Sequence, residues 1–419
     1  MDLTRYGRAR VVITGIGALT PLGRVKSFWE GLKAGRSGIR RIQHFDPSSL
    51  NVQIAGEVDF DPTEYLDYKE SRRMARCAQM AQVCAQFALE DSGLTRDYVN
   101  EHSERVGVVV GTALGGNEVI ESHTFKYKQT NGSRRPSPFA LINGLPNMPA
   151  HYVSREINAT GPMSALATAC ASGTQSLGDA TELIRSGRAD IIFAGGVEAM
   201  IQNYAIAGFE AMTALATGFN DRPEAASRPF DAGRNGFVFS EGAGIFVLES
   251  LENALKRGAN ILAEVLGHAS SSDAYHVAAL EPEGLGAQRA MRWALQDAHV
   301  DPSEIDYINA HGTSTKANDA IETFAIKKIF GELAYNIPIS STKSMVGHCL
   351  GGSGAVEAIA CVMSLLEQVI HPTINYETPD PDCDLDYVPN EARDSKVTKT
   401  LSNSFGLGGQ NACIVLGAV

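Results

Sequence analysis

The chain has 419 residues, of which 44% are hydrophobic and 20% charged. This composition excludes a disordered chain, and the length predicts either two large units or one large α/β body with an internal duplication. The formal net charge of −12 argues against sequence-independent nucleic-acid binding, which needs an excess of lysine and arginine. The seven cysteines form no dense disulfide framework and fit a reducing compartment.

Neither a secretory signal nor a membrane span is predicted. The N-terminal segment MDLTRYGRARVVITGIG has no apolar core before a small-residue cleavage site. The nearest candidate for a span, residues 355–366, is short and carries Glu357, so we expect a buried helix there. The sequence therefore predicts a soluble, cytoplasmic protein with no membrane or nucleic-acid partner.

Short β-branched runs alternate with helical patterns along the chain, which predicts an α/β fold. The predicted buried strands are 11–15, 106–111, 190–196 and 244–249, followed by 261–267, 305–312, 337–342 and 412–417. The predicted helices are 70–91, 172–186, 285–298, 319–330 and 354–368. Because the two series of strands are similar in length and number, we expect a pseudo-repeat whose halves meet near residue 255 and pack as one body.

Glycines gather in loops after the predicted strands, in GIGALTPLG, GTALGG, GGVEAM, GHCLGGSGA and GLGGQN. Any one of these clusters is typical of ordinary strand-to-helix connections. Five of them together indicate loops that frame a shared site, since glycine permits positive φ and close backbone approach.

Cys170 is the first candidate for chemistry. An apolar run ends at this cysteine, a helical pattern follows it, and small residues surround it in TACASG. A thiol at a helix N-terminus faces the positive end of the helix dipole, so we expect a lowered pKa and a reactive thiolate. The alternative, a buried structural cysteine, stays open on these residues alone.

His311 in NAHGTST and His348 in SMVGHCLGGSGA occupy equivalent loops at the ends of predicted strands. One such histidine is usually structural, but two of them with Cys170 could form a Cys-His-His set whose imidazoles form hydrogen bonds with an acyl oxygen. Lys343 precedes His348 by five residues. Its expected partner is Glu357, because a buried charge needs an opposite one.

These motifs, in this order, resemble the elongating β-ketoacyl-acyl-carrier-protein synthases of the thiolase superfamily, most closely those of the synthase II type. The resemblance rests on TACASG, NAHGTST, SSTKSMVGH and NSFGLGGQN, and it runs from VVITGIG to the final strand. It implies a thiolase fold of two βαβαβαββ halves in an α-β-α-β-α body. The N-terminal half, 1–254, would carry the nucleophilic cysteine, and the C-terminal half, 255–419, both catalytic histidines.

The resemblance implies an acyltransferase of fatty acid elongation that performs a decarboxylative Claisen condensation. Cys170 would take the acyl chain as a thioester, and the backbone N–H groups of Cys170 and Phe405 would form the oxyanion hole. His311 and His348 would assist decarboxylation of malonyl-acyl carrier protein, while Lys343, paired with Glu357, would organise the site. No cofactor or metal is expected beyond the phosphopantetheine that the acyl carrier protein brings.

The resemblance also implies further roles, and a homodimer. Phe405 would act as a gate between the acyl and malonyl sides, and the threonines would contact the pantetheine arm. The residues that would contact the arm are Thr313 and Thr315. Asp319 and Glu322 would support the His311 loop, and Leu114 and the region around Ile142 would line the acyl pocket. The sequence departs from the family pattern at Lys316, Asn318, Leu407 and Gln410, where Pro, Gly, Phe and Thr are usual.

Lys69, Arg72, Arg73 and Arg76 recur at i, i+3, i+4 and i+7, so one helix would place all four on one face. Such a basic stripe could dock the acidic acyl carrier protein despite the negative net charge, because docking depends on nearby charges. The alternative is an ordinary solvated helix face.

Three competing motifs are incomplete. Ser340 and Lys343 fit S-x-x-K, but S-D-N and K-T-G are missing, and GIGALT has Thr20 where the dinucleotide fingerprint needs glycine. The acidic run 380–391 imitates a calcium loop but has Leu385 at the glycine position. No Cys or His pair has zinc-ligand spacing.

Rival functions within the superfamily are also weighed. A thiolase would place a second cysteine in the C-terminal glycine loop, and Cys413 lies beyond that loop. A chain-initiating synthase would have Asn instead of His348, and a non-enzymatic chain-length partner would lack Cys170. A stand-alone ketosynthase of polyketide assembly shares the same Cys-His-His set and stays open.

Overall fold

The β-branched runs form strands that helices cover on both faces. In the computed structural model, which describes residues 2–419, all nine residues of β3 (Val11–Leu19) are buried. The other strands of the central sheet are β6 (Val106–Gly111), β7 (Met163–Leu166), β8 (Ile191–Glu198), β9 (Gly242–Ser250), β10 (Ala263–Ser272), β11 (Tyr307–Asn309), β12 (Ile339–Ser340), β15 (Lys399–Gly406) and β16 (Gln410–Gly417).

The sheet order is β12-β11-β15-β16-β10-β3-β9-β8-β6-β7. In one half, β6 is parallel to β7 and β8, while β9 is antiparallel to β8 and β3. The other half repeats this arrangement, with β11 parallel to β12 and β15, and β16 antiparallel to β15 and β10. The predicted pseudo-repeat is therefore confirmed, and a short antiparallel pairing of β3 with β10 joins the halves.

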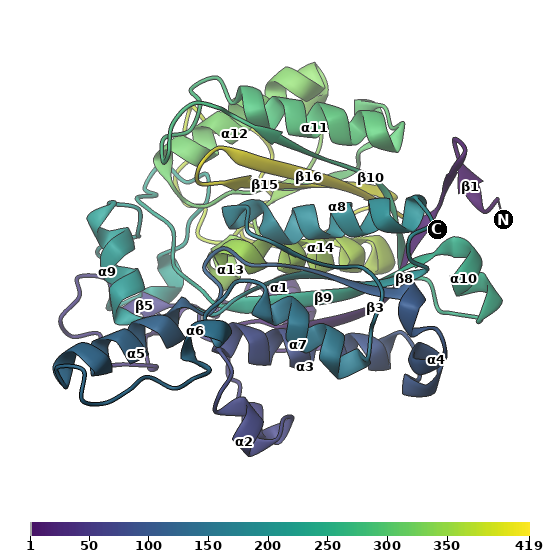
Figure 1. The fold of residues 1–419 in the computed structure, drawn as a ribbon. Coiled ribbons are helices and arrows are strands. Elements are labelled where there is room, and N and C mark those ends of the chain that lie inside the picture. Colours follow the sequence, from purple (N-terminus) through teal and green to yellow (C-terminus); the bar gives the residue numbers. More distant parts are fainter. Residues whose placement is uncertain (1) are drawn as a thin grey trace.

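Helices separate and enclose the two halves of the sheet, which gives the α-β-α-β-α layering (Figure 1). The central layer is α8 (Ser172–Arg185) and α14 (Leu350–Glu367), which contact strands of both halves. The outer layers are α3 (Arg76–Asp91) with α7 (Met148–Ile157), and α11 (Leu285–Ala298) with α12 (Lys316–Phe330). This layering agrees with the thiolase fold that the sequence resemblance implies.

The remaining elements are peripheral or connect the layers. The helices are α1 (Val25–Lys33), α2 (Tyr68–Ser71), α4 (Arg96–Glu101), α5 (Asn117–Gln129), α6 (Ala140–Asn143), α9 (Asn203–Ala211), α10 (Leu251–Lys256) and α13 (Lys343–Val346). Three two-stranded pairs are β1 (Thr4–Arg5) with β2 (Arg8–Ala9), β4 (Arg40–Arg41) with β5 (Ile54–Ala55), and β13 (Val369–Ile370) with β14 (Arg393–Asp394).

The single helix predicted over 70–91 is wrong. The chain forms α2 and α3 with a break between them, where Ala75 has the extended backbone angles φ −70° and ψ 148°. Tertiary contacts cause the break, because the Arg76 backbone N–H donates to Glu118 and its guanidinium donates to Glu241 and to the Val58 carbonyl. These contacts override the sequence periodicity.

Helix α14 is the one described helix that is long and apolar enough to cross a membrane, and 83% of its apolar window is buried inside the protein. Its burial follows from its place in the central layer, between the two halves of the sheet. The N-terminal ends of α8 and α14 lie at the same end of this layer as the loops that follow β6 and β11, and there the candidate site is found.

Candidate active site

Cys170 lies in a tight turn (Ala169–Ala171) directly before α8 and is 5% exposed. Ala169 takes a positive φ of 48°, which side-chain-bearing residues rarely adopt. The strained turn presents the thiol at the base of a cavity of about 710 Å³ that His311, His348 and Phe405 also line.

His348 is in direct contact with the thiol, since its Nε2 lies 3.1 Å from Cys170 Sγ. Its other ring nitrogen, Nδ1, lies 2.9 Å from the hydroxyl of Ser353 in the first turn of α14. Burial and the charge of Lys343 hold the pKa of His348 well below its usual value. The imidazole is therefore neutral near pH 7 and can accept the thiol proton.

His311 is held by its backbone and by Lys343. The N–H groups of His311 and Gly312 donate to the two oxygens of Glu322, each at 2.8 Å. The Lys343 ammonium lies 2.6 Å from the His311 carbonyl oxygen and 3.4 Å from Nδ1, and it forms a buried ion pair with Glu357. Because an ammonium can only donate, Nδ1 accepts, and the proton of the neutral ring sits on Nε2.

The lowered pKa expected for Cys170 is wrong. Burial raises the pKa of this thiol to about 11, although the charge of Lys343 and the Leu407 backbone N–H oppose the rise. Removal of the thiolate from water outweighs the favourable field at the start of α8. The thiol therefore stays protonated near neutral pH, and its proton must pass to His348 when it attacks.

This raised pKa predicts how alkylation of Cys170 depends on pH. The part of the iodoacetamide rate that passes through free thiolate should rise about tenfold per pH unit between pH 7 and 10, because the thiolate fraction grows until the pKa is reached; it adds to a pH-independent part in which His348 takes the thiol proton. Peptide mass spectrometry of Cys170 after timed quenching measures this rate. A plateau already at pH 7 to 8 would show that the thiol has the low pKa first expected.

The cavity extends from the thiol toward solvent between the start of α12 and the loop after β15. Phe405 lines it, and the centre of its ring lies 5.6 Å from the centre of the His311 ring. Thr313 and Thr315 line its wall, with their hydroxyls 2.9 Å apart. Of the four departures from the family pattern, Lys316, Asn318 and Leu407 line the cavity, whereas Gln410 does not.

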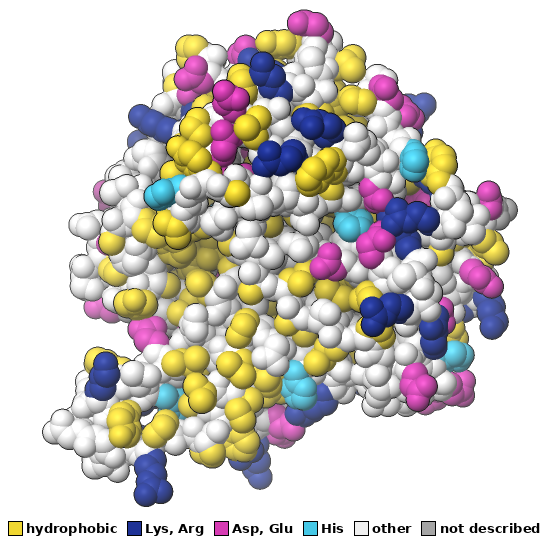
Figure 2. Space-filling model, turned by 45° about the horizontal axis from the view of Figure 1, so that its top comes forward, with side chains coloured by type: hydrophobic (Ala, Val, Ile, Leu, Met, Phe, Trp, Pro, Cys, Tyr) yellow, Lys and Arg dark blue, Asp and Glu magenta, His cyan; other side chains and the backbone are white. Residues whose placement is uncertain are grey.

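A second cavity of about 430 Å³ adjoins the first, and Phe209 and Met212 of the α9 region line both. Leu114 lies in its wall, and its role in an acyl pocket stays a prediction. Ile142, by contrast, is 50% exposed and lines neither cavity. Figure 2 shows a hollow with hydrophobic side chains on the left of the face that it presents.

The acidic residues near His311 have different partners. Burial raises the pKa of Glu322 to about 7, and the carboxylate also accepts from the Asn403 side chain. Asp319 accepts from the Phe230 backbone N–H at 2.8 Å and lies 3.4 Å from Arg234. Glu322 thus holds the His311 loop directly, whereas Asp319 also ties α12 to a neighbouring loop.

Sequence reasoning missed Glu198, a fully buried acid at the end of β8. It accepts hydrogen bonds from Thr112 and Ala113 in the loop after β6, and from the Gly351 N–H at the start of α14. It therefore joins the loop of Leu114 to the helix that follows His348. The only sequence signal was a glutamate inside the glycine cluster GGVEAM.

The basic residues outside the cavity do not form the predicted stripe. Lys69, Arg72 and Arg73 are exposed on or just after α2, but Arg76 is not available with them. Its guanidinium forms a 2.8 Å ion pair with the buried Glu241. Arg76 is therefore a structural residue, and the expectation that one helix face carries all four cations is wrong.

Among the residues that the structure describes, two groups of side chains have the composition of a metal site. The candidate ligand atoms of Cys170, His311 and His348 lie within 4.8 Å of one another. However, the proton on His311 Nε2 and the nearby Lys343 charge oppose cation binding there. In the second group, Glu182 and Asp297 are engaged in ion pairs with Arg8 at the surface.

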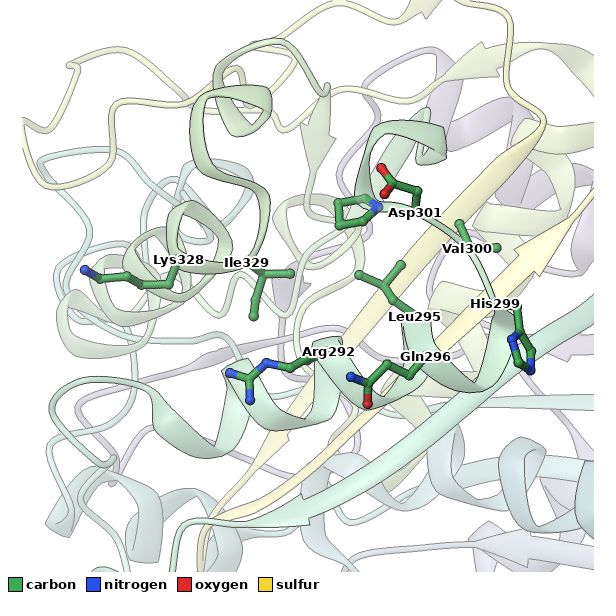
Figure 3. A pocket seen from close by; sticks show the side chains of 9 residues that line it. Arg292, Leu295, Gln296, His299, Val300, Asp301, Lys328 and Ile329 are labelled. Carbon is green, nitrogen blue, oxygen red and sulfur yellow. The ribbon is translucent and has the colours of Figure 1, made fainter.

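Another cavity, of about 660 Å³, lies on the outer side of the protein between α11 and α12 (Figure 3). Arg292 and Lys328 reach its rim from the two helices, and Leu295 and Ile329 form an apolar part of its wall. None of the candidate catalytic residues lines it, so the chemistry belongs to the cavity at Cys170.

Comparison with known families agrees with this geometry. The family model of the β-ketoacyl synthase N-terminal domain matches residues 8–254, and the model of the C-terminal domain matches residues 262–377. The chain belongs to the β-ketoacyl synthase family. Ketoacyl synthases of this family need no cofactor beyond the phosphopantetheine-bound substrate.

Similar curated proteins carry one name. The 3-oxoacyl-[acyl-carrier-protein] synthase 2 of Synechocystis is 47% identical over 97% of both chains. The protein of the same name from Staphylococcus aureus is 48% identical, also over 97% of both chains.

Solved ketosynthases share the whole fold. The ishigamide ketosynthase/chain length factor has a TM-score of 0.92 and 38% identity, over 98% of this chain and 100% of that one. A ketosynthase solved in complex with its type II PKS acyl-carrier protein has a TM-score of 0.90 and 36% sequence identity, over 98% of this chain and 100% of that one. A β-ketoacyl synthase from Burkholderia phymatum has a TM-score of 0.90 and 36% sequence identity, over 98% of this chain and 99% of that one.

Proposed function

We propose that this β-ketoacyl synthase condenses an acyl thioester with malonyl-acyl carrier protein, giving 3-ketoacyl-acyl carrier protein and CO2 in fatty acid elongation. The observation that carries the proposal is the contact of Cys170 Sγ with neutral His348, in one cavity with a His311 whose tautomer Lys343 fixes. The relatives named 3-oxoacyl-[acyl-carrier-protein] synthase 2 are 47% and 48% identical, against 36% for the PKS ketosynthase, which favours fatty acid over polyketide synthesis.

In the first half-reaction the acyl chain moves from carrier protein to enzyme. His348 Nε2 takes the proton of Cys170 as Sγ attacks the thioester carbonyl, and the backbone N–H groups of Cys170 and Phe405 receive the developing oxyanion. The carbon–sulfur bond to the carrier breaks, and its thiolate takes the proton back from His348. The acyl chain then extends past Phe209 and Met212 into the cavity of Leu114.

In the second half-reaction malonyl carrier protein enters past Phe405, with its pantetheine arm along Thr313 and Thr315. The Nε2–H groups of His311 and His348 donate to the malonyl thioester oxygen, so that loss of CO2 leaves an enolate stabilised by two hydrogen bonds. The enolate carbon attacks the acyl thioester and releases the Cys170 thiolate, which takes a proton from solvent. Lys343 and Glu357 act by keeping His311 in its donating form.

A purified reaction tests this function. The protein is mixed with acyl and malonyl carrier proteins, using acyl chains of several lengths, and the carrier-bound products are identified by mass spectrometry. Elongation predicts one 3-oxoacyl product, two carbons longer, for each accepted acyl chain, with CO2 released in equal amount. A series of products with several unreduced extensions would instead indicate polyketide assembly, and condensation without CO2 release would indicate a thiolase.

We further propose that Lys69, Arg72 and Arg73 dock the acidic acyl carrier protein. All three are exposed, and the Arg72 and Arg73 guanidinium groups lie 5.5 and 5.2 Å from the rings of Tyr68 and Phe139. The similar ketosynthase solved together with an acyl-carrier protein supports a carrier protein as the partner.

Reversal of this charge should weaken docking and spare the chemistry. In the double variant Arg72→Glu/Arg73→Glu, we expect the KM for acyl carrier protein to rise about tenfold with kcat nearly unchanged, because steering and docking charges act on encounter. Steady-state kinetics at two salt concentrations measure this. Arg292→Glu, on the far side of the protein, is the matched control, and equal KM values for the two variants would contradict the docking role.

A homodimer and a cytoplasmic location complete the proposal. Strand β7 ends the central sheet with its outer edge open and with Met163 50% exposed, so a second copy could continue the sheet. Exposed apolar side chains such as Leu141 and Ile142 gather near α5 and α6, the region at the lower left of Figure 2. Light scattering on the purified protein tests the dimer. The seven free cysteines fit a reducing cytoplasm. Membrane and nucleic-acid partners are not part of the proposal.

The division of the chain belongs to the same proposal. Residues 1–254 form the half that carries Cys170, and residues 255–419 form the half that carries His311 and His348. The predicted boundary falls within α10, the helix that connects β9 to β10. Each half alone would lack part of the site, since the reacting groups meet only where the halves pack together.

A further inference from the structure

The ring nitrogen of His348 that faces away from Cys170 contacts a side-chain hydroxyl. Its Nδ1 lies 2.9 Å from the hydroxyl of Ser353, and that hydroxyl lies 3.5 Å from the thiol of Cys349. All three residues are buried, with exposed fractions of 3% for His348 and 2% for each of the others. The three side chains form a short polar chain that starts at the catalytic imidazole and ends inside the protein.

This inference rests on the proposed function, in which the two half-reactions need opposite protonation states at Nε2 of His348. In acyl transfer, Nε2 must carry a lone pair, so the resting ring has its proton on Nδ1. In decarboxylation, Nε2 must carry a proton to donate to the malonyl oxygen, so Nδ1 must carry the lone pair. One imidazole serves both steps only if its outer partner tolerates both tautomers.

The structure provides such a partner. A hydroxyl donates one hydrogen bond and accepts others, and so does a thiol, whereas a backbone N–H or an ammonium only donates. When Nδ1 carries the proton, it donates to Ser353 Oγ, and Ser353 donates to Cys349 Sγ. When Nδ1 carries the lone pair, Cys349 donates to Ser353, and Ser353 donates to Nδ1. Burial raises the pKa of Cys349 to about 12, so this thiol keeps its proton in both states.

We propose that the chain His348–Ser353–Cys349 reverses direction between the half-reactions and lets His348 act first as a proton acceptor and then as a hydrogen-bond donor. Ser353 is thus a positioning residue that acts through His348. The contrast with His311 supports this assignment, because the Nδ1 of His311 faces the Lys343 ammonium at 3.4 Å and is held in one tautomer. One histidine is fixed and the other can switch.

Protons balance in this scheme. The Cys170 proton moves to His348 Nε2, and Nδ1–H of the resulting imidazolium is stabilised by Ser353 until the carrier thiolate takes the Nε2 proton back. In condensation the carbon–carbon bond to the malonyl carboxylate breaks, the electron pair forms the new bond to the acyl carbon, and the departing Cys170 thiolate takes one proton from solvent. Reversal of the chain keeps the number of protons constant, because the ring exchanges its Nδ1 proton for one at Nε2 through water in the cavity, while the Ser353 hydroxyl and the Cys349 thiol turn their protons toward His348.

The test uses three rates measured on the full-length protein. They are alkylation of Cys170 by iodoacetamide, acyl transfer from acyl carrier protein to Cys170, and decarboxylation of malonyl carrier protein. In Ser353→Ala we expect all three to fall about tenfold, because Nδ1 loses its partner in both tautomers. Ser353→Cys, which restores a group that donates and accepts, should recover a clear part of each rate. The matched control Ser364→Ala removes another buried serine hydroxyl of α14 and should leave all three rates unchanged.

The outcomes separate this inference from the proposed function. Wild-type protein that forms no 3-oxoacyl product overturns the function itself, and alkylation needs no carrier protein, so it reports on His348 in either case. If wild-type protein is active but Ser353→Ala slows only one half-reaction, the serine holds a single tautomer and the switch is overturned. Equal alkylation rates in Ser353→Ala and wild type also overturn it. Melting temperatures of the three serine variants, Ser353→Ala, Ser353→Cys and Ser364→Ala, show whether each is folded.

Discussion

Replacement of Cys170 by alanine should abolish the acyl-enzyme and reduce condensation by at least about a thousandfold. Loss of the nucleophile removes the covalent step altogether, and the remaining groups cannot substitute for it. The fold should be retained, because the change removes one sulfur from the wall of a cavity and leaves the hydrogen bonds of α8 intact. Intact-protein mass spectrometry after incubation with acyl carrier protein measures the adduct, and product analysis measures the rate.

A second cysteine variant serves as the matched control. Cys84 is also buried, with a pKa raised by burial, but it lies on α3 and outside the cavity. Cys84→Ala should therefore form the adduct at the wild-type rate. If Cys170→Ala retained full condensation, or if the adduct mapped to another cysteine, Cys170 would not be the nucleophile.

Loss of Lys343 should have the largest combined effect on stability and activity. Lys343 and Glu357 are each 1% exposed and form an ion pair, so Lys343→Met leaves a buried carboxylate without its partner. We expect the free energy of unfolding to fall by about 3 kcal/mol, since removal of one member of a buried pair is costly. Malonyl decarboxylation should slow more than tenfold, because His311 Nδ1 loses the donor that keeps the proton on Nε2.

The stability loss should depend on pH with a definite sign. Burial raises the pKa of Glu357, and without Lys343 nothing opposes that rise. A carboxyl whose pKa is raised in the folded state favours folding while it is protonated, so stability is highest at low pH and declines as the pH rises through that pKa. Urea unfolding of Lys343→Met at pH 5.5 and 8.0 should therefore show the larger loss at pH 8.0.

A double variant separates structure from chemistry at this pair. In Lys343→Met/Glu357→Leu no charge remains buried, so most of the lost stability should return, as replacement of buried ion pairs by apolar residues often shows. Decarboxylation should stay slow, because His311 still lacks its donor. Recovery of activity together with stability would mean that the pair only supports the fold.

The fold was predictable to the extent that local sequence decides it. Residues 106–111 and 285–298 form β6 and α11 with the predicted bounds, because their apolar patterns agree with the contacts they make. Strand β15 was missed since it buries Ser402, Asn403 and Ser404, which break any apolar pattern. Strand β7 was missed for the opposite reason, because it is mostly exposed at the edge of the sheet.

The site shows the same division. Short local motifs contain Cys170, His311, His348 and Lys343, so these residues could be named from the sequence before the fold was known. The thiol pKa was mistaken because desolvation depends on what packs over Cys170 from other segments. The prediction that Arg76 belongs to an exposed basic stripe was wrong because its partner, Glu241, is far away in sequence. Glu198 and Ser353 act through contacts that only the folded chain creates.

The most direct test of the account is a chase of the acyl-enzyme. The protein is first loaded with an acyl chain from acyl carrier protein, separated from the carrier, and then mixed with malonyl carrier protein while intact masses are followed. We predict that the adduct on Cys170 disappears at the same rate at which 3-oxoacyl-acyl carrier protein and CO2 appear. Persistence of the adduct while product forms, or its release as a free acid, would contradict a condensation that passes through Cys170.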